Sequence, residues 1–224
     1  MKITHIGQAG LLLESKDLTI MIDPYFTDSV GAVDPKKHRR VSMDDTLWDV
    51  KPDVLIFTHD HLDHYDPETA ERILKTHSGI TVLCPNSVWQ KVRLNGGGNN
   101  YVLFDRHTQW TEKGARFSAV RAAHSDSFAI GVILEAEGKT LYVTGDTLYN
   151  TEVLADVPKG IDLVFLPVNG VGNNMNACDA ARFVNTCGAK TAVPMHVGMF
   201  DDMTGDVLGM DNKVVLATYE SMEV

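Results

Sequence analysis

The chain has 224 residues, of which 44% are hydrophobic and 22% are charged, as in ordinary globular proteins. This length can bury one sizeable core, and no low-complexity tract marks a domain boundary, so we expect one folded domain. Thirty acidic and twenty basic residues give a formal net charge of -10. This charge is a poor match for the phosphate backbone of DNA or RNA, so we expect no nucleic-acid partner.

The cysteines and the apolar segments indicate where the protein resides. Cys84, Cys178 and Cys187 form no C-x-x-C pair and no even-numbered disulfide framework, as is typical of a reducing compartment. Apolar runs in residues 1–16 are too brief for a signal peptide, and no apolar stretch reaches the roughly 18 residues that a membrane span requires. We therefore expect a cytoplasmic protein without a membrane segment. Cys84 and Cys178 are expected to be buried apolar residues rather than reactive thiols.

Short strand-like segments dominate the chain. They are rich in Val, Ile, Leu and Phe, and Gly, Pro, Asp or Asn residues bound them. In chain order the expected strands cover residues 2–6, 10–15, 18–23, 53–59, 81–84, 101–104, 115–124, 129–137, 139–146, 162–168 and 191–196. The glycine turn at Gly138, between two strand patterns, predicts a hairpin.

Three segments have the helical spacing of apolar residues. They cover residues 66–77, 86–94 and 175–188. Pro67 stands in the first turn of the first segment, and Gly188 stands where the last helix should end. Helices alternate with strands, and the first half also has consecutive strands, so we expect mixed sheets with helices outside them.

Residues 57–64, FTHDHLDH, place three histidines and two aspartates on six consecutive positions. His59 and His61 leave a strand two residues apart, so their side chains can point the same way and bind one ion. Asp63 and His64 follow in the turn and can reach a second ion. A surface turn does not require histidine at these positions. The pattern therefore indicates a metal site.

This motif is part of a wider resemblance. Together with the downstream segments AAHSD, VTGDT and VPMHVG, THDHLDH resembles the metallo-β-lactamase-fold superfamily of metal-dependent hydrolases. The opening HIGQAGLLLES and LTIMIDPYFTDS are similar to the branch that includes the L-ascorbate-6-phosphate lactonases. The resemblance covers roughly residues 2–200. It implies an α/β (α+β) fold, a four-layer αβ/βα sandwich, formed by a single hydrolase domain over residues 1–224.

The resemblance also implies the ligands of two divalent metal ions. By position it assigns seven residues: His59, His61 and His124 to one ion, Asp63, His64 and His196 to the other, and Asp146 as the bridge between them. The last three in chain order, His124, Asp146 and His196, each close a predicted strand, where ligand residues commonly lie. Imidazole and carboxylate ligands without thiolate favour Zn, with Mn or Fe as alternatives.

These residues suggest hydrolysis by a hydroxide that the two ions generate from water near neutral pH. Asp63 and Asp146 are the candidate catalytic residues, because their carboxylates can orient the hydroxide and take or return its proton. The expected substrate is a small ester, lactone or phosphate-bearing metabolite. Residues 124–128 and 168–177 are expected to rim its pocket, with asparagine and glycine as donors.

Two further residues, Asp23 and His5, have alternative interpretations. Asp23 stands in an Asp-Pro turn and is also placed to hydrogen-bond a ligand imidazole, which would fix its tautomer. His5 lies on the first strand, where a core role is favoured over a role at the site.

Other functions remain open at this point. A nuclease or phosphodiesterase of the same fold is disfavoured by the absence of a basic face. A diiron redox protein has compatible ligand types, and a protein that binds metal without catalysis is the third class. The expected partner is a small-molecule substrate, and the resemblance is compatible with a homo-oligomer.

Overall fold

The structure is a computed structural model that describes all residues from 1 to 224. The chain folds into two compact units. The first comprises Met1–Phe104, Met199–Asp201 and Ala217–Val224, and the second comprises Asp105–Gly198 and Asp202–Leu216. The single domain expected from the sequence stays a prediction. No helix of either unit is long and apolar enough to cross a bilayer.

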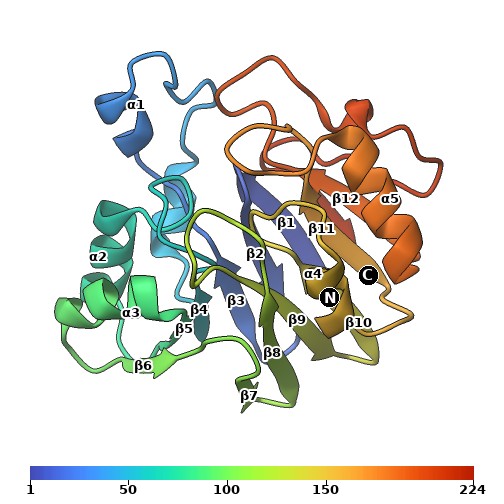
Figure 1. Cartoon of the computed structure of the whole chain (residues 1–224). Helices are drawn as coiled ribbons and strands as arrows, with labels where there is room; N and C mark the ends of the chain where they lie inside the picture. The colour runs from blue at the N-terminus through green and yellow to red at the C-terminus, as the bar shows by residue number, and fades with distance from the viewer. The chain divides into compact units, whose positions relative to one another are not determined.

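A seven-stranded mixed sheet forms the centre of the first unit (Figure 1). Its strands follow the order β13-β1-β2-β3-β4-β5-β6, and those from β3 to β6 run parallel. Their bounds are β1 (Lys2–Gly7), β2 (Gly10–Glu14), β3 (Thr19–Ile22), β4 (Val54–Ile56), β5 (Thr81–Cys84), β6 (Asn100–Leu103) and β13 (Ser221–Glu223). Parallel strands place their carboxyl ends at one edge of the sheet, so the segments after β3 and β4 leave it side by side.

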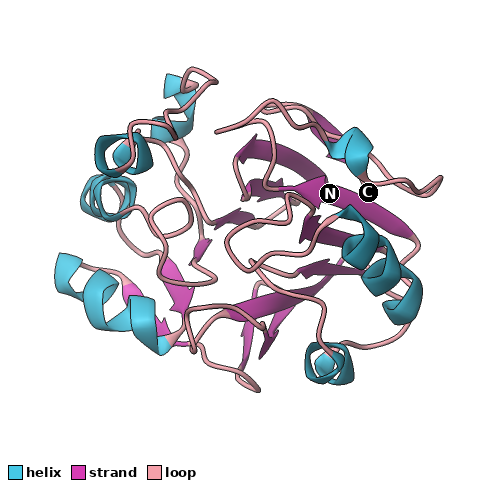
Figure 2. Cartoon of the chain, turned by 45° about the horizontal axis from the view of Figure 1, so that its top comes forward, coloured by secondary structure: helices cyan, strands magenta, loops and turns pink.

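Helices α2 and α3 flank the parallel strands of this unit (Figures 1 and 2). The helical elements of the unit are α1 (Ser29–Val33), η1 (Asp45–Asp49), α2 (Pro67–Thr76), α3 (Asn86–Val92) and η2 (Arg93–Asn95). Ala70, Ile73 and Leu74 form the buried face of α2 because they recur at helical spacing. They join one core with Leu55 and Phe57, and this packing fixes the segment that runs from β4 to α2.

The second unit is built on a six-stranded mixed sheet of order β12-β11-β10-β9-β8-β7. The strands from β7 to β10 are antiparallel, and β10, β11 and β12 are parallel. Their bounds are β7 (Gln109–Glu112), β8 (Ala115–Arg121), β9 (Ile130–Ala136), β10 (Lys139–Val143), β11 (Leu163–Pro167) and β12 (Thr191–Met195). Glu137 and Gly138, with φ of 51° and 73°, turn the predicted hairpin between β9 and β10.

Helix α5 covers the parallel strands of the second unit (Figure 2). The helical elements here are α4 (Thr151–Asp156), α5 (Ala177–Cys187) and η3 (Gly205–Val207). Phe183 and Val184 of α5 pack in one core with Tyr142 and Val164. The helix ends at Gly188, as predicted, in the left-handed conformation that glycine adopts without strain.

The elements confirm the predicted mixed α/β class, with two corrections. Every predicted strand is present, but β7 and β13 were not predicted because they are short edge strands without a buried face. Helices α1 and α4 were also missed, since neither exceeds two turns. The burial predicted for Cys84 is confirmed, whereas Cys178 is exposed because it lies on the outward side of the first turn of α5.

Candidate metal centre

In the first unit, the candidate ligands lie in the turn that follows β4. His59 is fully buried, and its Nε2 lies 3.0 Å from Nδ1 of His61. Two nitrogens bound to one tetrahedral ion, each at about 2.1 Å, would lie about 3.4 Å apart. The two nitrogens are at hydrogen-bond distance in this structure, and a separation increased by about 0.4 Å would suit a shared ion.

His64 is held by a buried carboxylate. Its Nδ1 lies 2.7 Å from Oδ2 of Asp23, and neither side chain is more than 1% exposed. Asp23 also accepts hydrogen bonds from the backbone N–H of Thr58 at 2.8 Å and from its hydroxyl at 2.6 Å. Because an ionised aspartate accepts and does not donate, a proton of His64 resides on Nδ1, and in the neutral ring the lone pair is then on Nε2, where a metal can bind. The hydrogen bond predicted between Asp23 and a ligand imidazole is thus present.

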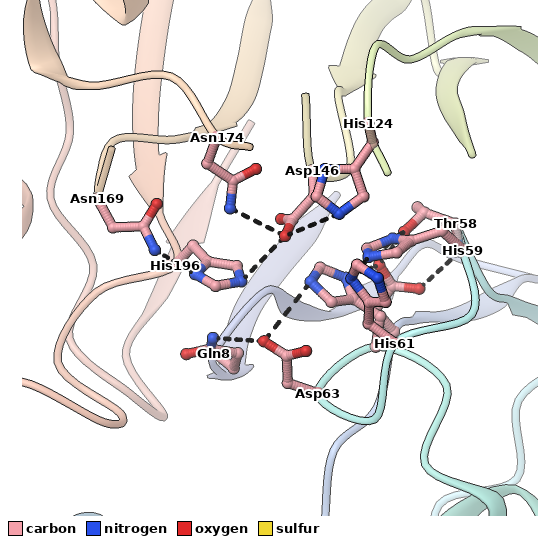
Figure 3. Close-up of polar contacts among 12 residues, drawn as sticks. Gln8, Thr58, His59, His61, Asp63, His124, Asp146, Asn169, Asn174 and His196 are labelled. Atoms are coloured by element: carbon pink, nitrogen blue, oxygen red, sulfur yellow. Dashed lines mark hydrogen bonds and ion pairs between the residues drawn. The ribbon is translucent and has the colours of Figure 1, made fainter. Parts of the chain in front are cut away.

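Asp63 is held by a glutamine that the sequence did not reveal. Nε2 of Gln8 donates a hydrogen bond of 2.8 Å to Oδ2 of Asp63 (Figure 3). Gln8 is 2% exposed and has a φ of 50°, in the tight turn between β1 and β2. His5 is buried, and its Nε2 lies 3.2 Å from the Gln8 carbonyl oxygen. His5 thus contacts this turn from a buried position, and the core role favoured for it stays a prediction.

In the second unit, Asp146 lies between two histidines. It follows β10 and is 5% exposed. Its Oδ2 lies 3.3 Å from Nε2 of His196, which follows β12, and 3.9 Å from Nε2 of His124, which follows β8 (Figure 3). The three candidates of this unit thus gather around one carboxylate oxygen, as their positions at strand ends suggested.

The loop after β11 contacts these three residues in turn. Asn174 donates a hydrogen bond of 2.9 Å from Nδ2 to Oδ2 of Asp146. Nδ2 of Asn169 lies 2.9 Å from Nδ1 of His196, and Nδ1 of His124 lies 3.2 Å from the Asn173 carbonyl oxygen. The side-chain amides of Asn169 and Asn174 contact candidate ligands, and the expected contact of this loop with a substrate stays a prediction.

Of residues 124–128, also expected to rim a pocket, all except Ser125 line a cavity of about 540 Å³. The cavity belongs to the second unit and includes Phe128 together with Arg106 and Arg121. In the other unit, burial raises the pKa of Tyr65, the residue after His64, to about 12. Tyr65 therefore stays protonated at neutral pH and acts as a packing residue, with its ring edge-to-face against Phe57.

The donor set fits divalent transition metals. In the first unit His59 and His61, and likewise Asp63 and His64, offer ligand atoms within 4.8 Å of one another, and so do His124 and Asp146 in the second. Imidazole and carboxylate ligands that neighbouring residues orient through hydrogen bonds are typical of Zn, Mn or Fe sites. These residues could therefore hold metal ions.

Most of the chain matches a known superfamily. A profile described as "Beta-lactamase superfamily domain" matches residues 19–197, which is most of the chain. The chain belongs to this superfamily. Over 226 aligned residues it is 32% identical to the "UPF0173 metal-dependent hydrolase" of Geobacillus thermodenitrificans (strain NG80-2), covering 92% of this chain and 89% of that protein. The predicted membership in the metal-dependent hydrolases of this superfamily is confirmed.

Solved structures confirm the fold of this superfamily member. Igni18, a metallo hydrolase from the archaeon Ignicoccus hospitalis KIN4/I, matches with a TM-score of 0.78 at 19% identity, over 100% of this chain and 98% of that one. An isothiocyanate hydrolase from Delia radicum gut bacteria matches with a TM-score of 0.77 at 21% identity, over 100% and 99% of the two chains. At these identities the similarity shows the metallo-β-lactamase type of fold.

Proposed function

We propose that this metal-dependent hydrolase cleaves a small ester, lactone or phosphate-bearing metabolite at a binuclear metal site. The proposed ligands are the seven residues that the sequence suggested: His59, His61, Asp63, His64, His124, Asp146 and His196. The observation that carries the proposal is the pairing of His64 with Asp23. A fully buried carboxylate fixes the imidazole in the tautomer that a metal ligand needs, which a histidine used only for packing does not require.

When bound, two divalent ions would lower the pKa of a water molecule and so supply a hydroxide near neutral pH. Zn is favoured, with Mn or Fe as alternatives. The protein's own part is orientation and proton transfer. Asp63 and Asp146 would orient the nucleophile and take or return its proton. Gln8 holds Asp63, and Asn174 holds Asp146, each through Oδ2, so both carboxylates have a defined direction.

Charge in the cavity beside His124 helps to choose among the substrate classes. Nε of Arg106 pairs with Asp156 at 2.6 Å, and Nη1 of Arg121 pairs with Glu152 at 2.5 Å. Both guanidinium charges are thus compensated by carboxylates of the same unit. This compensation favours a neutral ester or lactone over a multiply charged phosphate in the cavity.

A panel of substrates tests this proposal. Protein freed of metal and reloaded with Zn²⁺ or Mn²⁺ would be assayed with p-nitrophenyl acetate, a γ-lactone, bis-p-nitrophenyl phosphate and benzyl isothiocyanate. We expect hydrolysis of the ester or the lactone, loss of turnover with a chelator, and recovery on adding metal. Turnover of the phosphodiester alone would instead support the nuclease alternative. Metal-loaded protein that hydrolyses neither the ester nor the lactone nor the phosphodiester, whether or not it cleaves the isothiocyanate, would contradict the proposed substrate classes. A cytoplasmic location and a homo-oligomer stay predictions.

A further inference from the structure

The loop of residues 168–176 in the second unit contacts all three candidate ligands of that unit through its side-chain amides and a backbone carbonyl. The side-chain amide of Asn169 contacts His196, and that of Asn174 contacts Asp146. The backbone carbonyl oxygen of Asn173 contacts His124. The ligand residues come from three separate strands, and this loop is the element of the unit that contacts all three.

Backbone contacts give the loop a fixed shape. Asn169 and Asn176 form an antiparallel bridge, and the N–H of Gly170 donates to the Met175 carbonyl at 3.1 Å. The N–H of Met175 donates in turn to the carbonyl of Thr147 at 2.9 Å, which ties the loop to the residue after Asp146. Gly170, Gly172 and Asn173 have φ between 63° and 69°, a left-handed conformation that glycine and asparagine adopt most readily.

We propose that residues 168–176 form a positioning loop for the three ligands of the second unit, and that Asn174 is the positioning residue of Asp146. This inference rests on the proposed function, since positioning a ligand has a purpose only if Asp146 binds metal. It assigns the loop to the support of the metal ligands rather than to the substrate pocket.

The burial of Asn174 argues for this role. The residue is 4% exposed, and its Oδ1 is buried without a hydrogen-bond partner in the protein. A buried acceptor without a partner destabilises the folded state, and a leucine of similar volume would fill the space without that cost. Packing alone therefore does not account for an asparagine here. The donor that it presents to Asp146 does account for it.

Asn169 is suited to control the tautomer of His196. In this structure its Nδ2 faces Nδ1 of His196, so the ring proton resides on Nε2, 3.3 Å from Oδ2 of Asp146. Binding a metal through Nε2 requires the proton on Nδ1 instead. Rotating the Asn169 amide by about 180° would present Oδ1 as the acceptor that this tautomer needs.

Metal titration of the apo-protein tests the inference without an activity assay. Zn²⁺ would be titrated in competition with a chromophoric chelator into wild type, Asn174→Ala and Asn174→Leu, in which the leucine has a similar volume. We expect both variants to bind Zn²⁺ roughly 10- to 100-fold more weakly than wild type, as when outer partners of metal ligands are removed. Asn169→Leu should weaken only one of the two equivalents, because His196 is proposed to bind one ion only.

Val171→Ala is the matched control. Val171 stands in the same loop and is 63% exposed, so this variant should bind Zn²⁺ as wild type does. The melting temperature of each apo-variant would be measured in parallel. A merely structural role would lower that temperature and leave the affinity of the folded protein unchanged, and that result would overturn the inference.

The outcomes separate the inference from the proposed function. Wild type that binds no Zn²⁺, Mn²⁺ or Fe²⁺ would contradict the proposed function itself. Wild type that binds about two equivalents, with Asn174→Ala and Asn174→Leu equal to it in affinity, would contradict the positioning role alone. Should Asn174→Ala fail to fold, Asn174→Leu still decides the question, because it fills a similar volume and removes the donor without adding a charge.

Discussion

At the scale of single residues, Asp23 holds His64, a candidate metal ligand, in a defined orientation. Its carboxylate accepts three hydrogen bonds, from the backbone N–H and hydroxyl of Thr58 and from His64. Its φ of 45° lies in the left-handed region, which Asp and Asn tolerate better than most residues. An asparagine at this position can therefore adopt the same backbone conformation, but its side chain has one acceptor oxygen fewer.

Asp23→Asn should consequently weaken metal binding by roughly 10- to 100-fold and lower the free energy of unfolding by about 1 to 3 kcal/mol, because one buried donor loses its acceptor. Metal titration and urea unfolding of the apo-protein would measure the two effects. Asp17→Asn, at an exposed position, is the control. If Asp23→Asn bound metal as tightly as wild type, the pairing of Asp23 with His64 would no longer be evidence for a metal site.

His61→Ala and Asp146→Asn test two of the proposed ligands directly. Each should reduce metal occupancy and hydrolysis by orders of magnitude while leaving the protein folded, since the strands that precede these residues are held by the cores of their units. Cys178→Ala should barely change the rate, because Cys178 is exposed and the proposed reaction needs no thiol. Full activity in both ligand variants would mean that the site is misassigned.

At the scale of elements, an ion pair joins the end of α4 to the segment before β7. Asp156 accepts two hydrogen bonds from Arg106, at 2.6 and 2.9 Å, and one from the backbone N–H of Arg121 at 3.1 Å. Arg106 thereby holds the pKa of the Asp156 carboxyl below its ordinary value. A lowered folded-state pKa contributes stability above the unfolded pKa of about 3.9, and this stability is lost as the pH falls through the folded-state pKa.

Asp156→Asn should therefore destabilise the protein by about 1 to 2 kcal/mol at neutral pH, a range reduced for the partial exposure of the pair. The difference from wild type should shrink once the pH falls below about 4. Urea unfolding at a series of pH values would measure it, with the exposed Asp211→Asn as control. A difference that stayed constant down to strongly acidic pH would show that the charge of Asp156 does not contribute.

Some strands could be predicted from the sequence, and others could not. Strands such as β4 and β11 were predictable because continuous apolar runs bounded by turn residues mark a buried strand. Strand β7 alternates exposed and half-buried positions, and its pairing with β8 comes from tertiary structure that composition does not indicate. The contacts of Gln8 and Asn174 were missed for a related reason: both lie in loops, whose path depends on the whole unit.

At the scale of the whole molecule, each unit gathers its own candidate ligands where strands end. His59 and His64 follow β4 in the first unit, and His124 and His196 follow β8 and β12 in the second. The spacing of the first motif indicated a metal site by itself. The ligands of the second unit were predictable only through the family resemblance, because a lone histidine at a strand end is usually structural. Substrate identity was not predictable, since it depends on loops rather than on the fold.

The central claim is that this protein is a hydrolase that works with two metal ions. Inductively coupled plasma mass spectrometry of protein purified without chelating resin, paired with turnover before and after chelation, tests it most directly. We expect about two equivalents of Zn or Mn per chain and hydrolysis that disappears with the chelator and returns with the metal. Protein that contains iron, shows a visible absorption band and hydrolyses nothing would contradict the claim and favour a redox function.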